Sequence, residues 1–172
     1  MQRMIRALAL CTFGALAACT NPATLGGDDG FASGSGAPAT GLADGSASDP
    51  TSPAFFQQSV GDRVFFVVDQ STLTPEGQAT LSAQAAWLIE NPDFNALIEG
   101  HADEQGTREY NLALGARRAD AARAYLVSQG VPSARLQTVS LGKERPVAVS
   151  SDESCYSQNR RAVTVLSAGL SG

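Results

Sequence analysis

The chain has 172 residues, of which 43% are hydrophobic, and it carries a formal net charge of -5 at pH 7. This length allows one domain of ordinary size with appended segments, and it excludes two large domains. Domains that bind nucleic acid usually present a basic surface, so the acidic balance of the chain argues against nucleic acid as its partner.

Residues 1–18 have the anatomy of a signal peptide. Arg3 and Arg6 precede an apolar run over residues 7–18, and this run ends in small residues. The run is shorter than the roughly 20 residues that a membrane-spanning helix needs. We therefore expect cleavage after residue 18, and the alternative is an N-terminal anchor that is never cleaved.

Residues 16–19 read Leu-Ala-Ala-Cys and resemble the lipobox of bacterial lipoproteins. In that class the cysteine thiol receives a diacylglycerol, the signal is removed, and the new amine receives another acyl chain. The resemblance implies that Cys19 is lipidated and becomes the first mature residue. Each buried methylene contributes about 0.8 kcal/mol, so several chains anchor a protein stably. Thr20 at the second mature position implies delivery to the periplasmic face of the outer membrane.

Residues 19–58 are predicted to be the lipidated cysteine and a flexible linker. From Thr20 to Gln58 the sequence is dominated by small and turn-forming residues, contains no Lys or Arg, and shows no helical or strand period. Such a segment cannot bury enough apolar surface to offset the entropy lost on ordering. As a random coil it spans roughly 35 Å, and it reaches about 130 Å when stretched.

Residues 59–172 predict one domain of the α/β type, an α+β sandwich. β-Branched and aromatic residues predict four strands, at residues 63–68, 94–101, 136–141 and 162–166. Helical periodicity predicts two main helices, at residues 75–90 and 109–129, and a short third helix at residues 153–161. Thr74 and Pro75 predict the start of the first helix, and Gly130 the end of the second. The order of elements predicts a four-stranded mixed sheet with the helices on one face.

The stretch from Glu99 to Arg118 contains the residue types of a binding site. Acidic residues follow the second predicted strand, Gly106 predicts a turn, and Asn111 and Arg118 then share one helical stripe. One carboxylate, that of Asp103, and one guanidinium suit a zwitterion, because the first binds an ammonium and the second binds a carboxylate. From this pattern alone, a structural salt bridge between Asp103 and Arg118 is the commoner explanation.

Residues 100–126 are very similar to the OmpA-like C-terminal domain family, above all to its peptidoglycan-associated lipoproteins. The family pattern T/A-D-x-x-G-x-x-x-x-N-x-x-L-x-x-x-R is present at Ala102, Asp103, Gly106, Asn111, Leu114 and Arg118. The likeness continues through residues 140–146 and 156–161 and covers essentially all of residues 60–167. It implies an OmpA-like fold and a domain that binds peptidoglycan.

The resemblance also implies roles for single residues. In the family, the aspartate and the arginine bind the diaminopimelate side chain of the stem peptide, and these are Asp103 and Arg118 here. The further residues implied at the ligand are Asp69, Thr107 and Leu114, together with Asn111, which orders the loop. The chain departs from the family where residues 66–69 read Phe-Val-Val-Asp instead of Phe-Asp-aromatic-Asp, and where Gln105 replaces an arginine found in many relatives.

At the level of function, the resemblance implies a non-catalytic outer-membrane lipoprotein that tethers the outer membrane to the cell wall. It further implies membership of the Tol–Pal system, the periplasmic propeller TolB as protein partner, and a part in outer-membrane constriction during division. The alternative is a cell-wall hydrolase that uses Glu99, Asp103 or Glu104 as acid and base. Glycosidases need two carboxylates at a defined separation, and no such pattern is recognisable in the sequence.

We expect neither a cofactor nor a metal. The cysteines, Cys11, Cys19 and Cys155, match no zinc-binding spacing and predict no disulfide framework. His101, the only histidine, could share a strand face with Glu99 and Asp103 as a metal site. We favour a strand-end histidine in a hydrogen-bond network instead.

Overall fold

The computed structural model describes residues 45–169 of the chain. The predicted signal peptide, the lipidation site at Cys19 and most of the predicted linker lie outside the described residues. Within residues 45–169, no helix combines the length and the apolar character that crossing a membrane requires.

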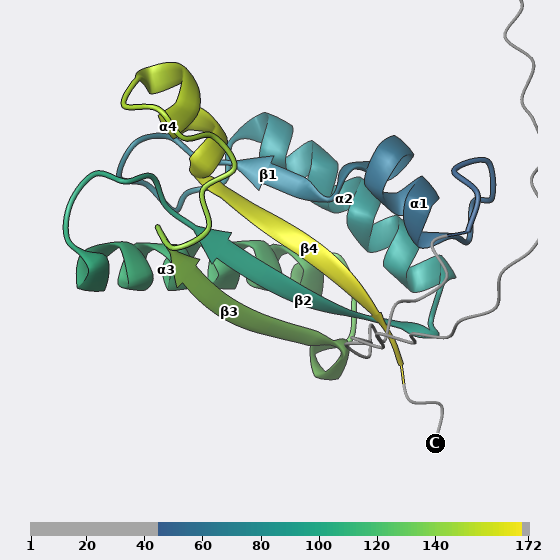
Figure 1. The fold of residues 1–172 in the computed structure, drawn as a ribbon. Coiled ribbons are helices and arrows are strands. Elements are labelled where there is room, and N and C mark those ends of the chain that lie inside the picture. The colour runs from purple at the N-terminus through teal and green to yellow at the C-terminus, as the bar shows by residue number, and fades with distance from the viewer. Residues whose placement is uncertain (1–44, 170–172) are drawn as a thin grey trace, which may run out of the picture. The chain divides into compact units, whose positions relative to one another are not determined.

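Four strands form one sheet in the spatial order β1-β4-β2-β3 (Figure 1). Strand β1 (Arg63–Phe65) pairs antiparallel with β4 (Arg161–Ala168), which also pairs antiparallel with β2 (Phe94–His101). Strand β2 pairs in parallel with β3 (Leu136–Gly142). The sheet is therefore mixed and four-stranded, as the sequence predicted.

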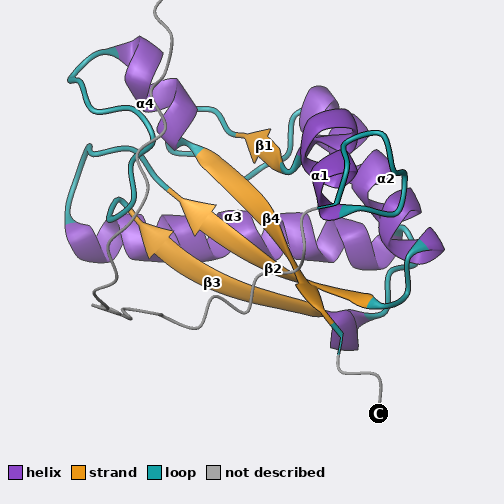
Figure 2. Ribbon diagram, turned by 45° about the vertical axis from the view of Figure 1, so that its right-hand side comes forward, coloured by secondary structure: helices purple, strands orange, loops and turns teal. Residues whose placement is uncertain are grey.

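Two long helices, α2 (Pro75–Glu90) and α3 (Arg108–Ser128), cover the same face of the sheet (Figure 2). Thr74 caps α2, because its hydroxyl oxygen accepts a hydrogen bond from the Gly77 amide at 3.1 Å. After α3, Gly130 adopts a positive φ of 104°, which suits glycine beyond a helix end. The short helix α4 (Glu153–Asn159) lies at the end of the sheet where β4 begins, and a short 3-10 turn (Ser133–Arg135) precedes β3.

The core lies between the helical layer and the sheet. Its buried apolar members come from all the main elements: Phe56, Val64, Phe66, Leu81, Ala85, Trp87, Leu88, Ala96, Ile98, Ala119, Ala122, Leu126, Val131, Leu136 and Ala162. This layer fixes the positions of the strand ends, at which the polar residues of interest lie.

A helical segment that the sequence did not predict precedes β1. Helix α1 (Pro53–Phe55) continues into a π-helical turn (Phe56–Gly61), and the buried ring of Phe56 lies 4.9 Å from that of Trp87. The predicted linker boundary at residue 58 is therefore too late. The Ser-, Ala- and Pro-rich composition predicted a linker, although the segment also contains Phe55 and Phe56. Burial of these two side chains offsets the entropy lost on ordering the segment.

Helix α3 lies very close to β2 because two glycines meet at their contact. A Cβ atom on Gly100 would lie only 1.8 Å from the main-chain oxygen of Gly115, and one on Gly115 would lie 2.7 Å from that of Gly100. No side chain fits between the two main chains. This contact fixes the start of α3 next to the end of β2.

Candidate functional site

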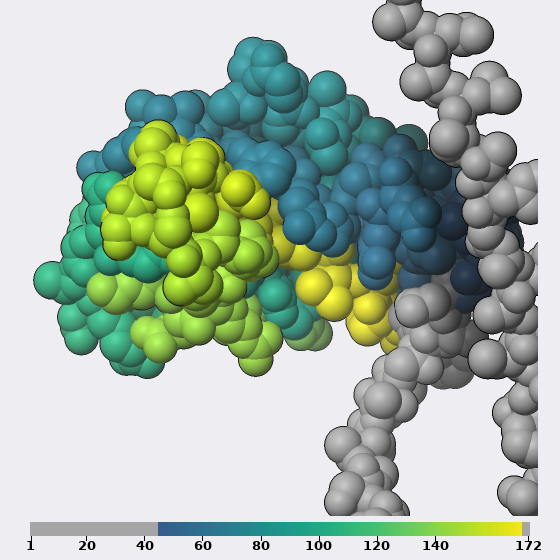
Figure 3. Space-filling view, turned by 45° about the horizontal axis from the view of Figure 1, so that its top comes forward, coloured from purple at the N-terminus to yellow at the C-terminus, as the bar shows by residue number. Residues whose placement is uncertain are grey.

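A pocket of about 310 Å³ lies where β2 ends and α3 begins. Its lining residues come from the loop after β1, the loop between β2 and α3, and the first turns of α3: Val68, Asp69, Asp103, Gln105, Gly106, Tyr110, Asn111 and Leu114. Four of the six residues expected at the ligand, Asp69, Asp103, Asn111 and Leu114, thus meet in one place. In the space-filling view, α4 and the segment before it (yellow-green) pack against the early part of the domain (blue) and the β2–α3 region (teal-green) (Figure 3).

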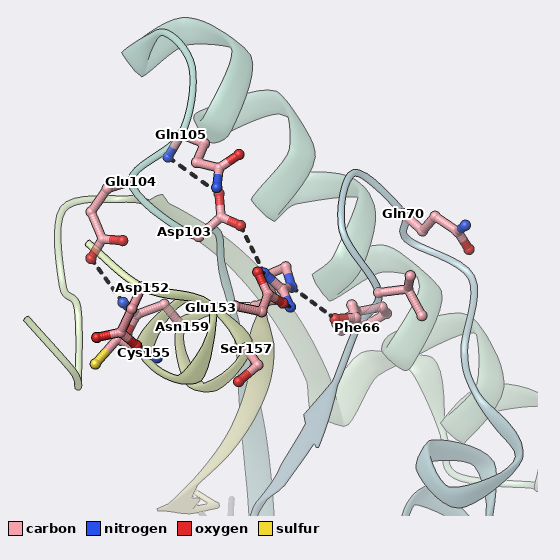
Figure 4. A network of polar contacts seen from close by, with 12 residues as sticks. Phe66, Gln70, Asp103, Glu104, Gln105, Asp152, Glu153, Cys155, Ser157 and Asn159 are labelled. Carbon is pink, nitrogen blue, oxygen red and sulfur yellow. Dashed lines mark hydrogen bonds and ion pairs between the residues drawn. The ribbon is translucent and has the colours of Figure 1, made fainter. Parts of the chain in front are cut away.

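Asp103 is a nearly buried carboxylate that is held from two directions. Its Oδ2 atom accepts a hydrogen bond from Nη1 of Arg160 at 3.2 Å, and its Oδ1 atom accepts one from the Gln105 amide at 3.3 Å (Figure 4). Its salt-bridge partner is therefore Arg160. The structural salt bridge between Asp103 and Arg118 that the sequence pattern suggested is not the one observed.

Asp69 supplies the second carboxylate of the pocket from the loop after β1. It has a positive φ of 59°, a left-handed conformation that costs a non-glycine residue roughly 1–3 kcal/mol. The turn is closed by a hydrogen bond from the Gln70 amide to the Val67 carbonyl at 3.2 Å. The chain therefore leaves the sheet after Phe65, earlier than the predicted strand end at residue 68. The phenol of Tyr110 donates a hydrogen bond to the Asp69 carboxylate.

Arg118 is fully buried and does not line the pocket. Its nitrogens donate to three main-chain oxygens: Nε to Gln70 (2.8 Å), Nη1 to His101 (2.9 Å) and Nη2 to Val67 (3.2 Å). Burial lowers the pKa of Arg118 to about 10, against the opposing effect of Asp103, so the group stays protonated at neutral pH. The guanidinium expected to bind a ligand carboxylate here ties the loop after β1 to the end of β2.

Of the other expected residues, Asn111 and Leu114 line the pocket, and Thr107 lies outside its lining. Asn111 donates to the Gln105 carbonyl at 2.7 Å and so holds the loop between β2 and α3, while its Oδ1 atom is buried without a partner among the described residues. Leu114 is buried in the pocket lining. Thr107 lies outside the lining and caps α3, because its hydroxyl oxygen accepts from the Tyr110 amide at 3.2 Å.

Arg160 is the main site residue that sequence reasoning missed. It is buried between α4 and β4, and besides Asp103 it binds Glu153 and the Phe66 carbonyl. Desolvation lowers the pKa of Arg160, but the hydrogen bonds with Glu153 and Asp103 outweigh this effect and raise it overall. The available signal was an arginine beside a predicted inner strand, since buried arginines are usually paired with an acceptor. Because Arg160 and Arg161 are both buried, they form no exposed basic patch.

His101 provides no metal site. Its Nε2 atom lies 3.6 Å from Oε2 of Glu99, and within residues 45–169 no group of His, Cys, Asp and Glu side chains is arranged to hold a metal ion. Desolvation, followed by the charges of Arg161 and Arg145, lowers the pKa of His101 to about 4. Neither ring nitrogen has a hydrogen-bond partner among the described residues, so the network expected around this histidine is not formed.

Known proteins resemble the chain over most of its length. Residues 65–160 match the OmpA family. A peptidoglycan-associated lipoprotein of Rhizobium meliloti (strain 1021) is 55% identical over 152 residues, which cover 88% of this chain and 81% of the relative. One from Mesorhizobium japonicum is 58% identical over 127 residues, which cover 74% of this chain and 76% of the relative.

A solved structure supports the same assignment. The crystal structure of the peptidoglycan-associated lipoprotein from Burkholderia pseudomallei matches with a TM-score of 0.63 and 43% identity, over 70% of this chain and 98% of that one. These three relatives bear the name of a lipoprotein and not that of an enzyme, in agreement with the expectation that the chain is not an enzyme. The chain belongs to the OmpA family and, within it, to the peptidoglycan-associated lipoproteins.

Proposed function

We propose that this protein binds the diaminopimelate residue of the peptidoglycan stem peptide and thereby tethers the outer membrane to the cell wall. The observation that carries the proposal is the meeting of two carboxylates, those of Asp69 and Asp103, in one pocket on a domain of this family. Family membership supports peptidoglycan as the ligand. The chemistry of the pocket supports diaminopimelate as the part of peptidoglycan that is bound.

The pocket offers oxygen acceptors to a cation. Besides the two carboxylates, the buried Oδ1 atom of Asn111 has no partner among the described residues and belongs to a side chain of the lining. An ammonium has three N–H donors, and its hydrogen bonds to carboxylates are roughly twice as strong as neutral ones. The ammonium at the end of the diaminopimelate side chain therefore suits the acceptors of Asp69, Asp103 and Asn111.

The carboxylate on the same carbon of diaminopimelate is the proposed ligand of Arg118. Because this guanidinium is buried behind the loop after β1, the ligand must displace at least one of its bonds to Val67 or Gln70. A charged carboxylate is a stronger acceptor than a main-chain carbonyl and matches the guanidinium fork. Binding thus exchanges main-chain partners of Arg118 for the ligand, while Thr107 and Leu114 shape the surroundings.

The proposed location and partners are supported by the family and by the sequence of residues outside the described part. The proposal includes lipidation of Cys19, attachment to the periplasmic face of the outer membrane, and the linker that begins at Thr20 as the tether. It also includes the Tol–Pal system, a TolB-like propeller as protein partner, and support of outer-membrane constriction in division. The lipobox-like sequence and the relationship to named lipoproteins support this part of the proposal.

Co-sedimentation with purified diaminopimelate-type sacculi tests the proposed function. The full-length chain is expected in the pellet, and Asp69→Asn and Asp103→Asn are expected to move it to the supernatant. Soluble wall fragments released during overnight incubation would support the hydrolase alternative. A wild-type chain that stays in the supernatant would refute the proposal, and capture of a propeller protein from periplasmic extract would test the partner separately.

A further inference from the structure

Arg160 joins the two loops that carry the acidic residues of the pocket. Its Nη1 atom donates to Asp103, on the β2–α3 loop, at 3.2 Å, and its Nε atom donates to the carbonyl of Phe66, on the loop after β1, at 3.3 Å. Glu153 binds the same guanidinium, and Figure 4 labels Asp103, Phe66 and Glu153, which all belong to this network. One rigid planar group thus contacts both walls of the site without lining the pocket itself.

Glu153 on α4 changes what this guanidinium does to the pocket. It accepts hydrogen bonds from Nη2 of Arg160 and from Nη1, the nitrogen that also binds Asp103, and its own side chain is largely exposed. A bare cation beside Asp103 would repel an incoming ammonium. With Glu153 bound to the same guanidinium, the Arg160–Glu153 pair has no net charge, so the negative charge of Asp103 remains available to a ligand.

We propose that Arg160 is a positioning residue for ligand binding, which orients the Asp103 carboxylate and fixes its spacing from the Asp69 loop. This inference rests on the proposed function, because it concerns the same pocket. With Oδ2 held by Arg160 and Oδ1 held by the Gln105 amide, the Asp103 carboxylate has one defined orientation. An ammonium that meets an already oriented carboxylate loses less entropy on binding.

Arg161 provides a matched control. It is as buried as its neighbour, but its nitrogens donate only to the main-chain oxygens of Asn159 (3.4 Å) and Arg145 (3.2 Å). Replacing either arginine removes a buried guanidinium from the junction between α4 and β4. Only the replacement of Arg160 also removes a contact to a pocket carboxylate.

The test compares Arg160→Gln, Arg160→Lys and Arg161→Gln in the full-length chain purified in detergent. Calorimetry with a soluble muropeptide that carries a diaminopimelate tripeptide gives the affinity, and thermal melting gives the stability. Arg160→Gln is expected to weaken binding at least about tenfold, because Asp103 loses the charged hydrogen-bond donor that orients it. Arg160→Lys keeps the charge and should recover part of the loss, whereas Arg161→Gln should stay within about twofold of wild type.

A spectroscopic readout separates positioning from general loosening. The Gln105 amide reports the Asp103 carboxylate directly, so its resonance in the ¹H–¹⁵N spectrum should move in Arg160→Gln and stay in Arg161→Gln. Equal or tighter binding by Arg160→Gln would overturn the proposal, as would an equal loss in Arg161→Gln. If Arg160→Gln does not fold, wild-type affinity in Arg160→Lys together with an unmoved Gln105 resonance would overturn it. If the wild-type chain itself does not bind the muropeptide, the proposed function fails, and the Gln105 resonance still decides whether Arg160 orients Asp103.

Discussion

Tyr110, in the first turn of α3, donates a hydrogen bond from its phenol to the carboxylate of Asp69 on the loop after β1. Both residues line the pocket, and Tyr110 is 43% exposed. The bond therefore joins two walls of the site at a position open to solvent. It restrains a carboxylate whose own main chain is in a left-handed conformation.

Tyr110→Phe removes this bond and keeps the ring. We expect binding of a diaminopimelate muropeptide to weaken about 3- to 10-fold, because the net value of one such hydrogen bond is near 1 kcal/mol. Calorimetry measures the change, and Tyr156→Phe on α4, outside the pocket lining, is the control. Tighter binding by Tyr110→Phe would show that the phenol competes with the ligand for Asp69.

Arg118→Ala is expected to destabilise the domain rather than only to weaken binding. The change leaves three main-chain carbonyls without their donor, and the free energy of unfolding should fall by at least about 3 kcal/mol. Urea unfolding measures the loss. Arg117→Ala, the exposed neighbour on the same helix, should stay within about 0.5 kcal/mol of wild type. An Arg118→Ala chain as stable as wild type would show that the three bonds contribute nothing to folding.

The domain should prefer diaminopimelate-type wall to lysine-type wall. Lysine ends in an ammonium alone, which leaves Arg118 without the ligand carboxylate. Leaving one member of a charge pair unmatched typically costs about 2–5 kcal/mol, and we expect the lower limit, roughly 30-fold in affinity, because Arg118 keeps main-chain partners. Calorimetry with two stem peptides that differ only at this residue measures the ratio. Equal affinities would restrict Arg118 to tying the loops together.

His101 should make the stability of the domain depend on pH. Its folded-state pKa of about 4 lies below its ordinary value of 6.5. Between these two pH values, His101 is protonated in the unfolded chain and neutral in the folded chain. Its stabilising contribution is present above pH 6.5 and is lost as the pH falls towards 4, by up to about 3 kcal/mol.

Urea unfolding of wild type and His101→Leu at pH 7 and at pH 4.5 measures this contribution. The variant should lose less stability over this interval than wild type, with Glu99, Arg145 and Arg161 unchanged around the site. Parallel losses in the two proteins would show that the titration of His101 contributes nothing and that the carboxylates alone produce the acid sensitivity.

The elements that could be predicted are those with local signals. Thr74 and Pro75 fixed the start of α2, and Gly130 the end of α3, because capping depends on neighbouring residues alone. The helical turns over residues 53–61 were missed because their stability comes from burial of Phe56 against Trp87. That contact joins residues far apart in the sequence, and the local composition gives no sign of it.

In the site, too, the residues that could be predicted are those that lie close together in the sequence. Asp103 and Asn111 lie within one short stretch, so the spacing of the motif was enough to bring them together. The pairing of Asp103 with Arg160 spans 57 positions and depends on β4 lying next to β2, which spacing could not reveal. Helical periodicity placed Arg118 on the correct stripe, but it could not show whether the guanidinium would end in the pocket or against main-chain carbonyls.

The contact between Gly100 and Gly115 has a consequence for variation among pockets of this kind. The strand that leads to Asp103 and the helix that carries Asn111 diverge from one point, where main chain touches main chain. The distance between the end of β2 and α3 is therefore set by this main-chain contact and not by the side chains that line the pocket. Substitutions in the lining, such as those at Val68 and Gln105, can alter which groups contact a ligand while the distance between the end of β2 and α3 is unchanged.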